Sequence, residues 1–317
     1  MNKLPLISKN FLIPGFVLLV VLIILAALPY FGSKYSIIFL STIFMYIVLT
    51  TSWVMFSGPT GQISLATAVF FGIGIYVAAI LGMHMPLLVM VLIGGLISSA
   101  MALLVGALTL RLKGVYFTIF TFGLLELIKN LINWYEVTFT GTRGRFVVVV
   151  DNNTIYFYML AIVVLTLLTT FLIRRSKYGL ALQSIGEQEE AAAHIGINVT
   201  LMKVSAFAIS AFFMGAAGAV MATRWTYIDP FMGFNMNYSF TPVLMAIFGG
   251  VGQLGGVVVG AIIFAYLEQI LITKYPYYYM LLFGIVMVIS MLFLPNGLAG
   301  LVQKLRARTT GGQYAHS

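Results

Sequence analysis

The chain has 317 residues, of which 61% are hydrophobic and only 8% are charged, with a mean hydropathy of +1.06. Soluble domains carry charge on about a quarter of their residues, so this composition excludes a soluble protein and indicates an integral membrane protein. The net charge of +9 does not indicate nucleic-acid binding, because the basic residues lie in short loops and tails between charge-free runs, where they orient membrane spans.

The sequence lacks the residue patterns of enzymes and metal sites. No cysteine occurs, and His84, His194 and His316 share no ligand spacing, so neither a metal nor another cofactor is expected. No Gly-Lys pair could build a phosphate-binding loop, and no Gly-x-Ser-x-Gly elbow, His-Glu-x-x-His pair or close carboxylate dyad appears. We therefore expect no enzyme, and energy for active transport would have to come from a partner.

Ten helical segments are expected to cross or re-enter the membrane. A crossing helix needs about 20 apolar residues, and polar, Gly and Pro clusters divide the charge-free runs accordingly. The expected spans are 11–30, 36–56, 62–82, 87–110, 115–134, 155–173, 204–222, 239–255, 257–273 and 277–294. The first span is expected to remain uncleaved, because Pro29 and Tyr30 replace a small-residue cleavage site. This predicts an all-α polytopic membrane protein with a single transmembrane domain over residues 1–317.

The basic residues predict the orientation of these spans. With a cytoplasmic N-terminus, eleven Lys and Arg residues lie inside and five lie outside, as the positive-inside rule favours. The five outer residues are Lys34, Arg143, Arg145, Arg224 and Lys274. Ten crossings place both termini and a loop at 174–203 in the cytoplasm. The stretch 135–153 then becomes an external loop, and its β-prone valines at 147–150 predict a short strand.

Two segments interrupt the apolar pattern and are candidates for a solute pathway. Residues 58–67 combine a turn with polar side chains, and irregular backbone at membrane depth survives only inside protein or beside water. The eighth and ninth spans have only 17 residues each and are joined by a Gly-rich stretch, so either could be re-entrant. The candidate pathway residues are Gly61, Gln62, Ser64, Thr67, Gly249, Gly250 and Gly252. Ser64 and Thr67 are expected to face one cavity, and the alternative for this segment is an ordinary interfacial turn.

Small residues recur at four-residue spacing in several spans. The three sets are Gly94, Ser98, Ala102 and Gly106; Ala211, Gly215 and Ala219; and Gly252, Gly256 and Gly260. Such faces let helices approach closely in a membrane, where no hydrophobic effect distinguishes lipid from side chain. The sets therefore predict tight helix packing, and the alternative is a smooth face that slides or lines a path.

Few ionisable residues fall within the expected spans. Glu126 and Lys129 are one helical turn apart and are expected to pair, which lowers the cost of burying either charge. A neutralised pair near the outer end of a helix is more often structural than part of a transport pathway. Glu268 is expected near the outer boundary as a solvated carboxylate.

A short polar loop, residues 174–203, stands out in this lipid-soluble chain. Basic residues mark its ends, namely Arg174, Arg175, Lys177 and Lys203. Three acids, Glu187, Glu189 and Glu190, precede an Ala-rich run that can end at Gly196, which is the favourable order for a helix start and stop. This predicts a short helix within 179–196 that is exposed for a partner. The alternative is an amphipathic helix on the membrane surface.

The run Glu190-Ala191-Ala192-x-x-x-Gly196 resembles the coupling motif of ABC-importer permeases, a short helix that inserts into a cleft of an ATP-binding subunit. Its surroundings are similar to the LivM-type branched-chain amino acid permeases. Further matching stretches follow in order along nearly the whole chain, at 60–65, 70–74, 111–116, 249–252, 260–261 and 293–298. The chain departs from the family pattern at Ala66 and Thr67, where Gly-His is usual, and at Thr241-Pro242, where a Glu is usual.

The resemblance implies a permease subunit of an ABC importer in a bacterial or archaeal plasma membrane. The implied partners are a second homologous, LivH-like permease, two ATP-binding subunits, an external solute-binding protein and membrane lipid, and no nucleic acid. The residues implied to couple the chain to the ATPase are Glu187, Glu189, Glu190, Ala191, Ala192 and Gly196. ATP-driven closure of the partners would move this helix and open the pathway alternately to either side. The implied substrate is a branched-chain or other hydrophobic amino acid.

Two other classes of function remain as alternatives. A self-sufficient secondary transporter or channel would use Glu126, Lys129 or Glu268 as coupling charges, and the scarcity of such charges argues against it. A structural membrane scaffold would need no pathway, so Gln62→Ala and Thr67→Ala would then be silent in an uptake assay.

Overall fold

The computed structural model describes residues 12–82, 84–110, 112, 114–278, 281, 282, 284, 285, 288, 297, 298 and 300. Most of the predicted tenth span, 277–294, lies outside this part of the chain. So do Arg111 and Lys113, most of the matching stretch at 293–298, and both termini, whose predicted cytoplasmic placement is therefore not described.

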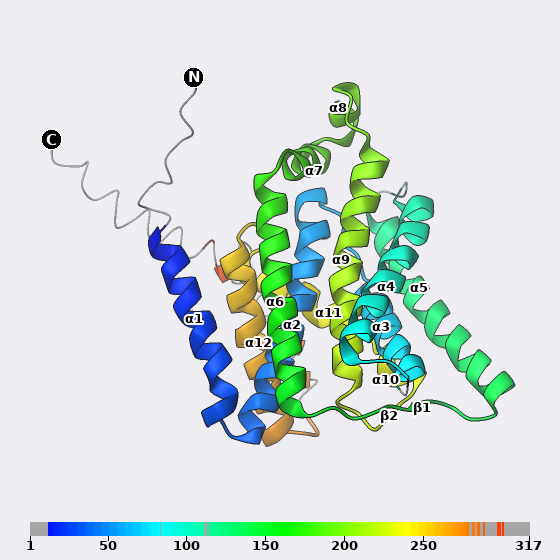
Figure 1. Ribbon diagram of the computed structural model, residues 1–317. Helices are drawn as coiled ribbons and strands as arrows, with labels where there is room; N and C mark the ends of the chain where they lie inside the picture. Colours follow the sequence, from blue (N-terminus) through cyan, green and yellow to red (C-terminus); the bar gives the residue numbers. More distant parts are fainter. Residues whose placement is uncertain are drawn as a thin grey trace.

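The described chain is a bundle of long helices that run roughly side by side (Figure 1). The helices of the bundle are α1 (Leu12–Phe31), α2 (Lys34–Thr60), α3 (Thr67–Leu81), α4 (Leu87–Thr109), α5 (Val115–Tyr135), α6 (Asn152–Arg175), α9 (Val199–Ala222), α11 (Asn237–Gly249) and α12 (Leu254–Lys274). Six helical segments within the described residues are long and apolar enough to cross a membrane. They are α2, α4, α5 continued to Thr140, α6, α9 and α12. The all-α polytopic architecture is thus confirmed, and the number of ten spans stays a prediction.

Polar side chains set the starts of several helices. Ser33 accepts a hydrogen bond from the Ser36 amide at 3.2 Å before α2, and Asn198 accepts one from the Leu201 amide at 3.1 Å before α9. Each oxygen satisfies a backbone donor that has no partner within the first helical turn. At the other end of α2, Gly61 adopts the left-handed conformation with φ of 67°, which stops the helix.

The centre of the bundle is α9, which packs against α3 and α4 through small residues. A Cβ atom on Gly74 would overlap the Gly215 carbonyl, and one on Gly94 would lie 3.1 Å from the Ala219 Cβ. The first two sets of small residues are therefore packing faces, as predicted. In the third set, Gly260 packs against α11, whereas Gly252 lies in the turn before α12 and was wrongly grouped with it.

Two predicted spans are shorter than expected, because one helix begins late and the other ends early. Helix α3 begins only at Thr67, since residues 61–66 are not helical. Helix α11 has 13 residues and ends at Gly249, which gives a length of about 20 Å against the roughly 30 Å of a hydrocarbon core. The eighth predicted span is therefore the short one, while α12 with 21 residues has the length of a full crossing.

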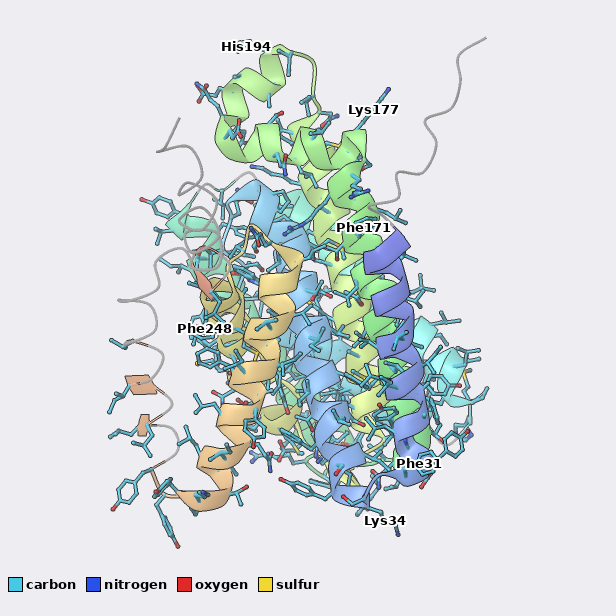
Figure 2. The ribbon with its side chains drawn as sticks, turned by 90° about the vertical axis from the view of Figure 1, so that its left-hand side faces the viewer. Phe31, Lys34, Phe171, Lys177, His194 and Phe248 are labelled. Carbon is cyan, nitrogen blue, oxygen red and sulfur yellow. The ribbon has the colours of Figure 1, made fainter. Side chains whose placement is uncertain are left out.

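The two predicted loops lie at opposite ends of the bundle (Figure 1). One end carries α7 (Lys177–Glu187) and α8 (Glu189–His194). The other carries the π-helix η2 (Glu136–Thr140), the short helix α10 (Pro230–Gly233) and the antiparallel strands β1 (Arg145–Phe146) and β2 (Tyr227–Ile228). Figure 2 shows α8, with His194 at its tip, standing beyond the bundle at the end opposite Phe31 and Lys34.

The strand in the 135–153 loop lies before the predicted valines. Residues 145 and 146 pair with 228 and 227. The valines add only two hydrogen bonds to the same segment, from the Val147 amide to the Thr226 carbonyl at 2.9 Å and from the Val150 amide to the Thr223 carbonyl at 3.1 Å. The position of the strand depends on where the segment after α9 provides a partner, so β-propensity alone placed it wrongly.

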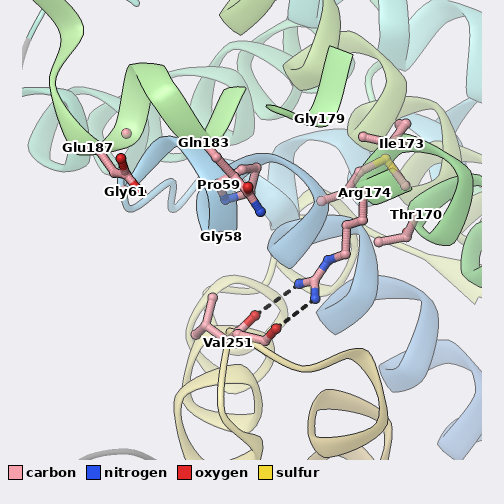
Figure 3. Close-up of a pocket in the computed structure, with 13 residues that line it drawn as sticks. Gly58, Pro59, Gly61, Thr170, Ile173, Arg174, Gly179, Gln183, Glu187 and Val251 are labelled. Atoms are coloured by element: carbon pink, nitrogen blue, oxygen red, sulfur yellow. Dashed lines mark hydrogen bonds between the residues drawn. The ribbon is translucent and has the colours of Figure 1, made fainter. Parts of the chain in front are cut away.

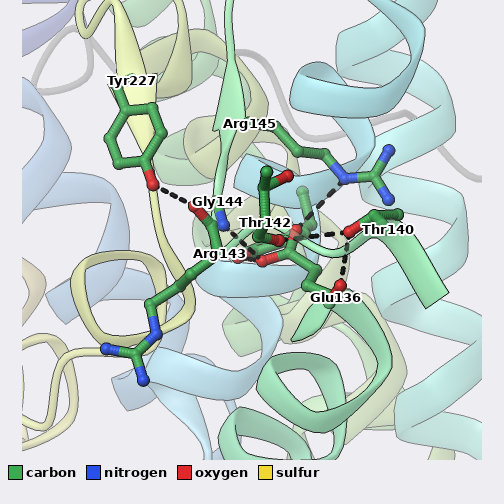
Figure 4. A network of polar contacts seen from close by, with 8 residues as sticks. Glu136, Thr140, Thr142, Arg143, Gly144, Arg145 and Tyr227 are labelled. Carbon is green, nitrogen blue, oxygen red and sulfur yellow. Dashed lines mark hydrogen bonds and ion pairs between the residues drawn. The ribbon is translucent and has the colours of Figure 1, made fainter. Parts of the chain in front are cut away.

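The same end is held together by a buried carboxylate (Figure 4). Glu136 is 1% exposed and accepts hydrogen bonds from the Gly144 amide at 2.8 Å and the Arg145 Nε at 3.2 Å. The Tyr227 hydroxyl donates to the Arg143 carbonyl. These contacts bind the loop after α5 to the π-helix and to β2 at the end of the bundle opposite α8.

Candidate functional site

The polar loop at 174–203 forms two helices rather than the single helix predicted within 179–196. Helix α7 ends at Glu187 and α8 starts at Glu189, because Gln188 between them is extended with φ of −154° and ψ of 100°. The predicted stop is confirmed: Gly196 has φ of +88°, and the Ile197 amide donates to the Ala192 carbonyl at 3.1 Å. This is the pattern that terminates a helix at a left-handed glycine.

Helix α8 presents one side to solvent and fixes the other to the bundle. Glu190 and Ala191 are exposed, whereas Ala192 is 2% exposed. Glu189 forms an ion pair with Lys203 of α9, with 2.7 Å between Oε2 and Nζ. The Lys203 side chain is only 1% exposed, so the pair holds the start of α8 firmly against α9.

Helix α7 connects α8 to the ends of two long helices. The Tyr178 hydroxyl lies 2.7 Å from the Ser205 Oγ and 3.0 Å from the Met202 carbonyl of α9. Burial raises the pKa of the Tyr178 phenol above its ordinary value, against the opposite effect of Ser205, so the hydroxyl stays protonated and can donate. At the other end of α7, a Cβ atom on Gly186 would overlap the Pro59 carbonyl of α2, so the two backbones are in direct contact.

A cavity of about 460 Å³ opens between α7, the ends of α2 and α6, and the turn before α12 (Figure 3). Three predicted site residues from separate motifs line it, namely Gly61, Glu187 and Gly252. Arg174 crosses it, with NH1 donating to the Gly252 carbonyl at 2.9 Å and NH2 to the Val251 carbonyl at 3.0 Å. The guanidinium thus fastens the end of α6 to the turn between α11 and α12.

Arg174 was predicted as an orientation signal and as a basic residue at the start of the polar loop, and not as a site residue. Its position at the last turn of a span was visible in the sequence, but such residues usually face lipid headgroups or water. Its carbonyl partners lie 77 and 78 residues away in the chain, so no local pattern could reveal them.

The irregular segment 61–66 is buried at Gln62 and at residues 64–66 and exposed at Gly61 and Ile63, so its role in a solute pathway stays a prediction. Side chains from three helices satisfy its polar groups. The hydrogen bonds run from Trp53 Nε1 to the Ser64 carbonyl at 2.8 Å, from Thr118 Oγ1 to the Ile63 carbonyl at 2.9 Å, from the Leu65 amide to Thr121 Oγ1 at 3.0 Å, and from Ser239 Oγ to the Leu65 carbonyl at 2.6 Å. Without these partners the buried backbone would be costly, so the segment is a specified element of the fold.

The remaining candidate pathway residues do not share the cavity. Ser64 and Thr67 face one interior cluster with Trp53 and Phe207, and this cluster leaves no room for a water molecule. Gln62 is buried and donates from Nε2 to the Leu112 carbonyl at 3.3 Å. Gly249 and Gly250 lie at the end of α11, where Gly249 packs directly on Gly256 of α12. The predicted set therefore divides between a cavity, an interior cluster and a helix contact.

The intramembrane charges differ from expectation in their surroundings. Glu126 and Lys129 pair as predicted, at 2.6 Å, but they lie in the middle of a span that continues through η2 to Thr140 rather than near its end. Glu268 of α12 is half-buried and reaches Tyr46 of α2, because α12 packs on α2 along this face. The prediction of a solvated Glu268 carboxylate is therefore wrong.

The contacts among these residues form links between helices. In the part of the chain that the structure describes, no three His, Asp or Glu side chains gather where they could hold a metal ion. The site instead consists of rigid links between α8, α7, the end of α2 and the irregular segment. Such links can transmit a displacement from the tip of the molecule into its interior.

Comparison with known proteins agrees with this architecture. Residues 35–291 match the model of a family described as the branched-chain amino acid transport system permease component. The chain belongs to this family. It is 28% identical to the LivM permease protein of the high-affinity branched-chain amino acid transport system of Salmonella typhimurium, over 98% of this chain and 82% of that protein.

Shorter similarities extend to other permeases. The chain is 32% identical to the xylose transport system permease XylH of Haemophilus influenzae over 38% of this chain and 33% of that protein. It is 29% identical to the LivH permease of Salmonella typhimurium over 32% of each chain. No solved structure matches. The chain is a multi-pass membrane permease subunit of an ABC importer.

Proposed function

We propose that this permease couples ATP-driven movement of partner subunits to its solute pathway through α8 and α7. The observation that carries the proposal is the position of α8, which stands beyond the bundle while Glu189–Lys203 fixes it to α9. Exposed Glu190 and Ala191 offer a small, acidic surface to a cleft in an ATP-binding subunit.

The route from α8 to the interior follows direct contacts. A displacement of α8 pulls on α9 through Lys203 and on α7 through the Gln188 junction. Helix α7 then pushes the last turn of α2, since Gly186 and Pro59 touch through their backbones. The end of α2 leads at once into the irregular segment 61–66, which is the element best placed to change shape.

The assembly consists of this chain, a second homologous permease, two ATP-binding subunits and an external solute-binding protein. Similarity to both LivM and LivH supports a pair of related permeases. The positive-inside rule places α7, α8 and both chain termini in the cytoplasm of a bacterial or archaeal cell, with β1 and β2 on the external side where a solute-binding protein would arrive.

The solute is a branched-chain or other hydrophobic amino acid. This assignment is supported by the family description and by similarity to LivM along nearly the whole chain. Gly61, Glu187 and Gly252 line the cavity on the cytoplasmic side, where the solute would leave. The interior cluster that contains Ser64 and Thr67 would then be a closed part of the pathway.

Copurification with an ATPase readout tests the coupling proposal. The tagged chain, expressed with its partner genes and extracted in mild detergent, should carry ATPase activity with it. Glu190→Lys should release the ATP-binding subunits while the second permease stays bound, because a reversed charge is placed on the exposed side of α8. Asn153→Lys, an exposed position at the opposite end, is the control and should retain the ATPase. Retention by Glu190→Lys as well would refute the proposal.

A further inference from the structure

Helix α5 carries polar side chains on a side that no described part of the chain covers. It leans outward from the bundle (Figure 1), and its residues Gly123, Glu126 and Asn130 follow one another at spacings of three and four. The Glu126 side chain is 37% exposed, Asn130 is exposed, and a Cβ atom on Gly123 would meet nothing within 4 Å. With 3.6 residues per turn, these three positions share one face of the helix.

This face lies at mid-membrane depth. Glu126 follows the start of α5 by eleven residues, which corresponds to about 17 Å along the axis, and the span continues beyond it to Thr140. A carboxylate exposed to hydrocarbon at that depth is costly, and ionisable residues in spans almost always face protein or a water-filled cavity. This cost disfavours lipid as the neighbour of the Glu126 carboxylate.

Helix α4 shows what a lipid-facing surface of this chain looks like. Its exposed large side chains are all aliphatic, namely Leu88, Leu92, Leu96, Ile97, Leu103, Leu104 and Leu108. No charged residue occurs anywhere in α4. Helix α5 also exposes large apolar side chains, among them Ile119 and Leu127, so its exposed side differs from that of α4 by the addition of Glu126 and Asn130.

The ion pair on α5 is arranged asymmetrically. Lys129 is 15% exposed, and its Nζ lies 5.7 Å from the centroid of the Phe231 ring of α10, so the ammonium points toward the bundle. The Glu126 carboxylate is the outer member of the pair, at 2.6 Å from that ammonium. A zwitterionic solute carries the same two charges, so it can take the place of this ion pair. Its ammonium group would contact Glu126 and its carboxylate would face Lys129, which leaves no net charge in the membrane.

We infer that the second permease covers the Gly123–Glu126–Asn130 face of α5 and leaves a water-filled passage there, in which Glu126 receives the ammonium group of a zwitterionic amino acid. The inference rests on the proposed function for the second permease and for the class of solute. Among the proposed partners, the second permease is the one embedded in the bilayer, so it is the subunit that can exclude lipid at this depth.

Thiol labelling tests the water-filled passage directly, because the chain has no cysteine of its own. Asn130→Cys and the aliphatic control Leu96→Cys are placed in the assembled complex in membranes and exposed to a charged methanethiosulfonate reagent. The reagent reacts only with the thiolate. Apolar surroundings raise the pKa of a thiol, and a rise of one pH unit lowers the thiolate fraction, and with it the labelling rate, about tenfold. Asn130→Cys should label at least about tenfold faster than Leu96→Cys, and the solute should protect it. Equal slow rates would overturn the inference.

The role of Glu126 is tested by transport. Glu126→Gln should weaken the apparent affinity for uptake by about tenfold to a hundredfold, the loss expected for a hydrogen bond to a charged group. Glu268→Gln, the matched intramembrane carboxylate that faces α2, should leave it unchanged. Glu126→Asp should recover part of the loss, and copurification of the second permease checks that each variant folds. Unchanged uptake by Glu126→Gln would overturn the ammonium contact.

Failure of the proposed function gives a different result. If the ATP-binding subunits did not copurify with the chain, the coupling proposal would fail, while the thiol rates at positions 130 and 96 would still report whether water reaches α5. Conversely, slow labelling at 130 in a complex with full ATPase activity would overturn only the inference about α5.

Discussion

The ion pair between Glu189 and Lys203 predicts an asymmetric response to mutation. Lys203 is 1% exposed and Glu189 is 31% exposed, so removal of the carboxylate strands a buried ammonium, whereas removal of the ammonium leaves a carboxylate that water can reach. Removal of the partner of a buried charge costs about 3 kcal/mol or more, and loss of a partner by an accessible charge costs about 1 kcal/mol or less. Glu189→Ala should therefore destabilise α8 more than Lys203→Met does.

Amide hydrogen exchange of residues 189–197 measures this difference locally. Because each 1.4 kcal/mol is a factor of ten in an equilibrium constant, Glu189→Ala should speed exchange about a hundredfold and Lys203→Met about fivefold. The double variant should resemble Lys203→Met, since no charge is then left buried. Exchange in α4 is the internal control. Equal acceleration by the two single variants, or none in either, would refute the account of how α8 is held.

Two further variants test the contacts behind α8. Gly186→Val should force α7 off the Pro59 carbonyl and uncouple ATP hydrolysis from uptake, so ATPase activity persists while uptake falls. Gly255→Val, which adds bulk in α12 where no described atom lies near, is the control for copurification, ATPase activity and uptake. Ser239→Ala should lower stability by about 2–3 kcal/mol in a thermal unfolding assay, because the Leu65 carbonyl and the Ala68 amide both lose a buried partner.

Each of these two predictions has an outcome that would contradict it. Tightly coupled uptake in Gly186→Val would show that contact between α7 and α2 does not transmit movement. Stability unchanged by Ser239→Ala would show that the irregular segment is held by packing alone, with its hydrogen bonds contributing nothing measurable.

The sequence predicted the helices of this protein better than its irregular backbone. Apolar length and Gly or Pro breaks located the described spans, and Gly196 marked the end of α8 because a left-handed glycine has a local signature. The break at Gln188 was not predicted, because no Gly or Pro stands there. The extended Gln188 both ends α7 and precedes α8. The shortness of α11 was expected only as one of two possibilities.

The candidate site was predicted in parts but not as an arrangement. Gly61, Glu187 and Gly252 were chosen from three separate motifs, and only the fold brings them to one cavity. Arg174 joins them through backbone carbonyls, which carry no residue-type signal in a sequence. The exposed position of Glu126 was likewise invisible, because pairing with Lys129 at a spacing of three suggested a neutral structural contact.

Uptake in proteoliposomes tests the central claim most directly. The purified chain alone and the complete complex with its solute-binding protein are each loaded into vesicles and supplied with labelled amino acid, with and without ATP enclosed on the α8 side. The account predicts no uptake by the chain alone and ATP-dependent uptake by the complex, which Glu190→Lys abolishes. Uptake by the chain alone, or by the complex without ATP, would contradict it and indicate a self-sufficient transporter.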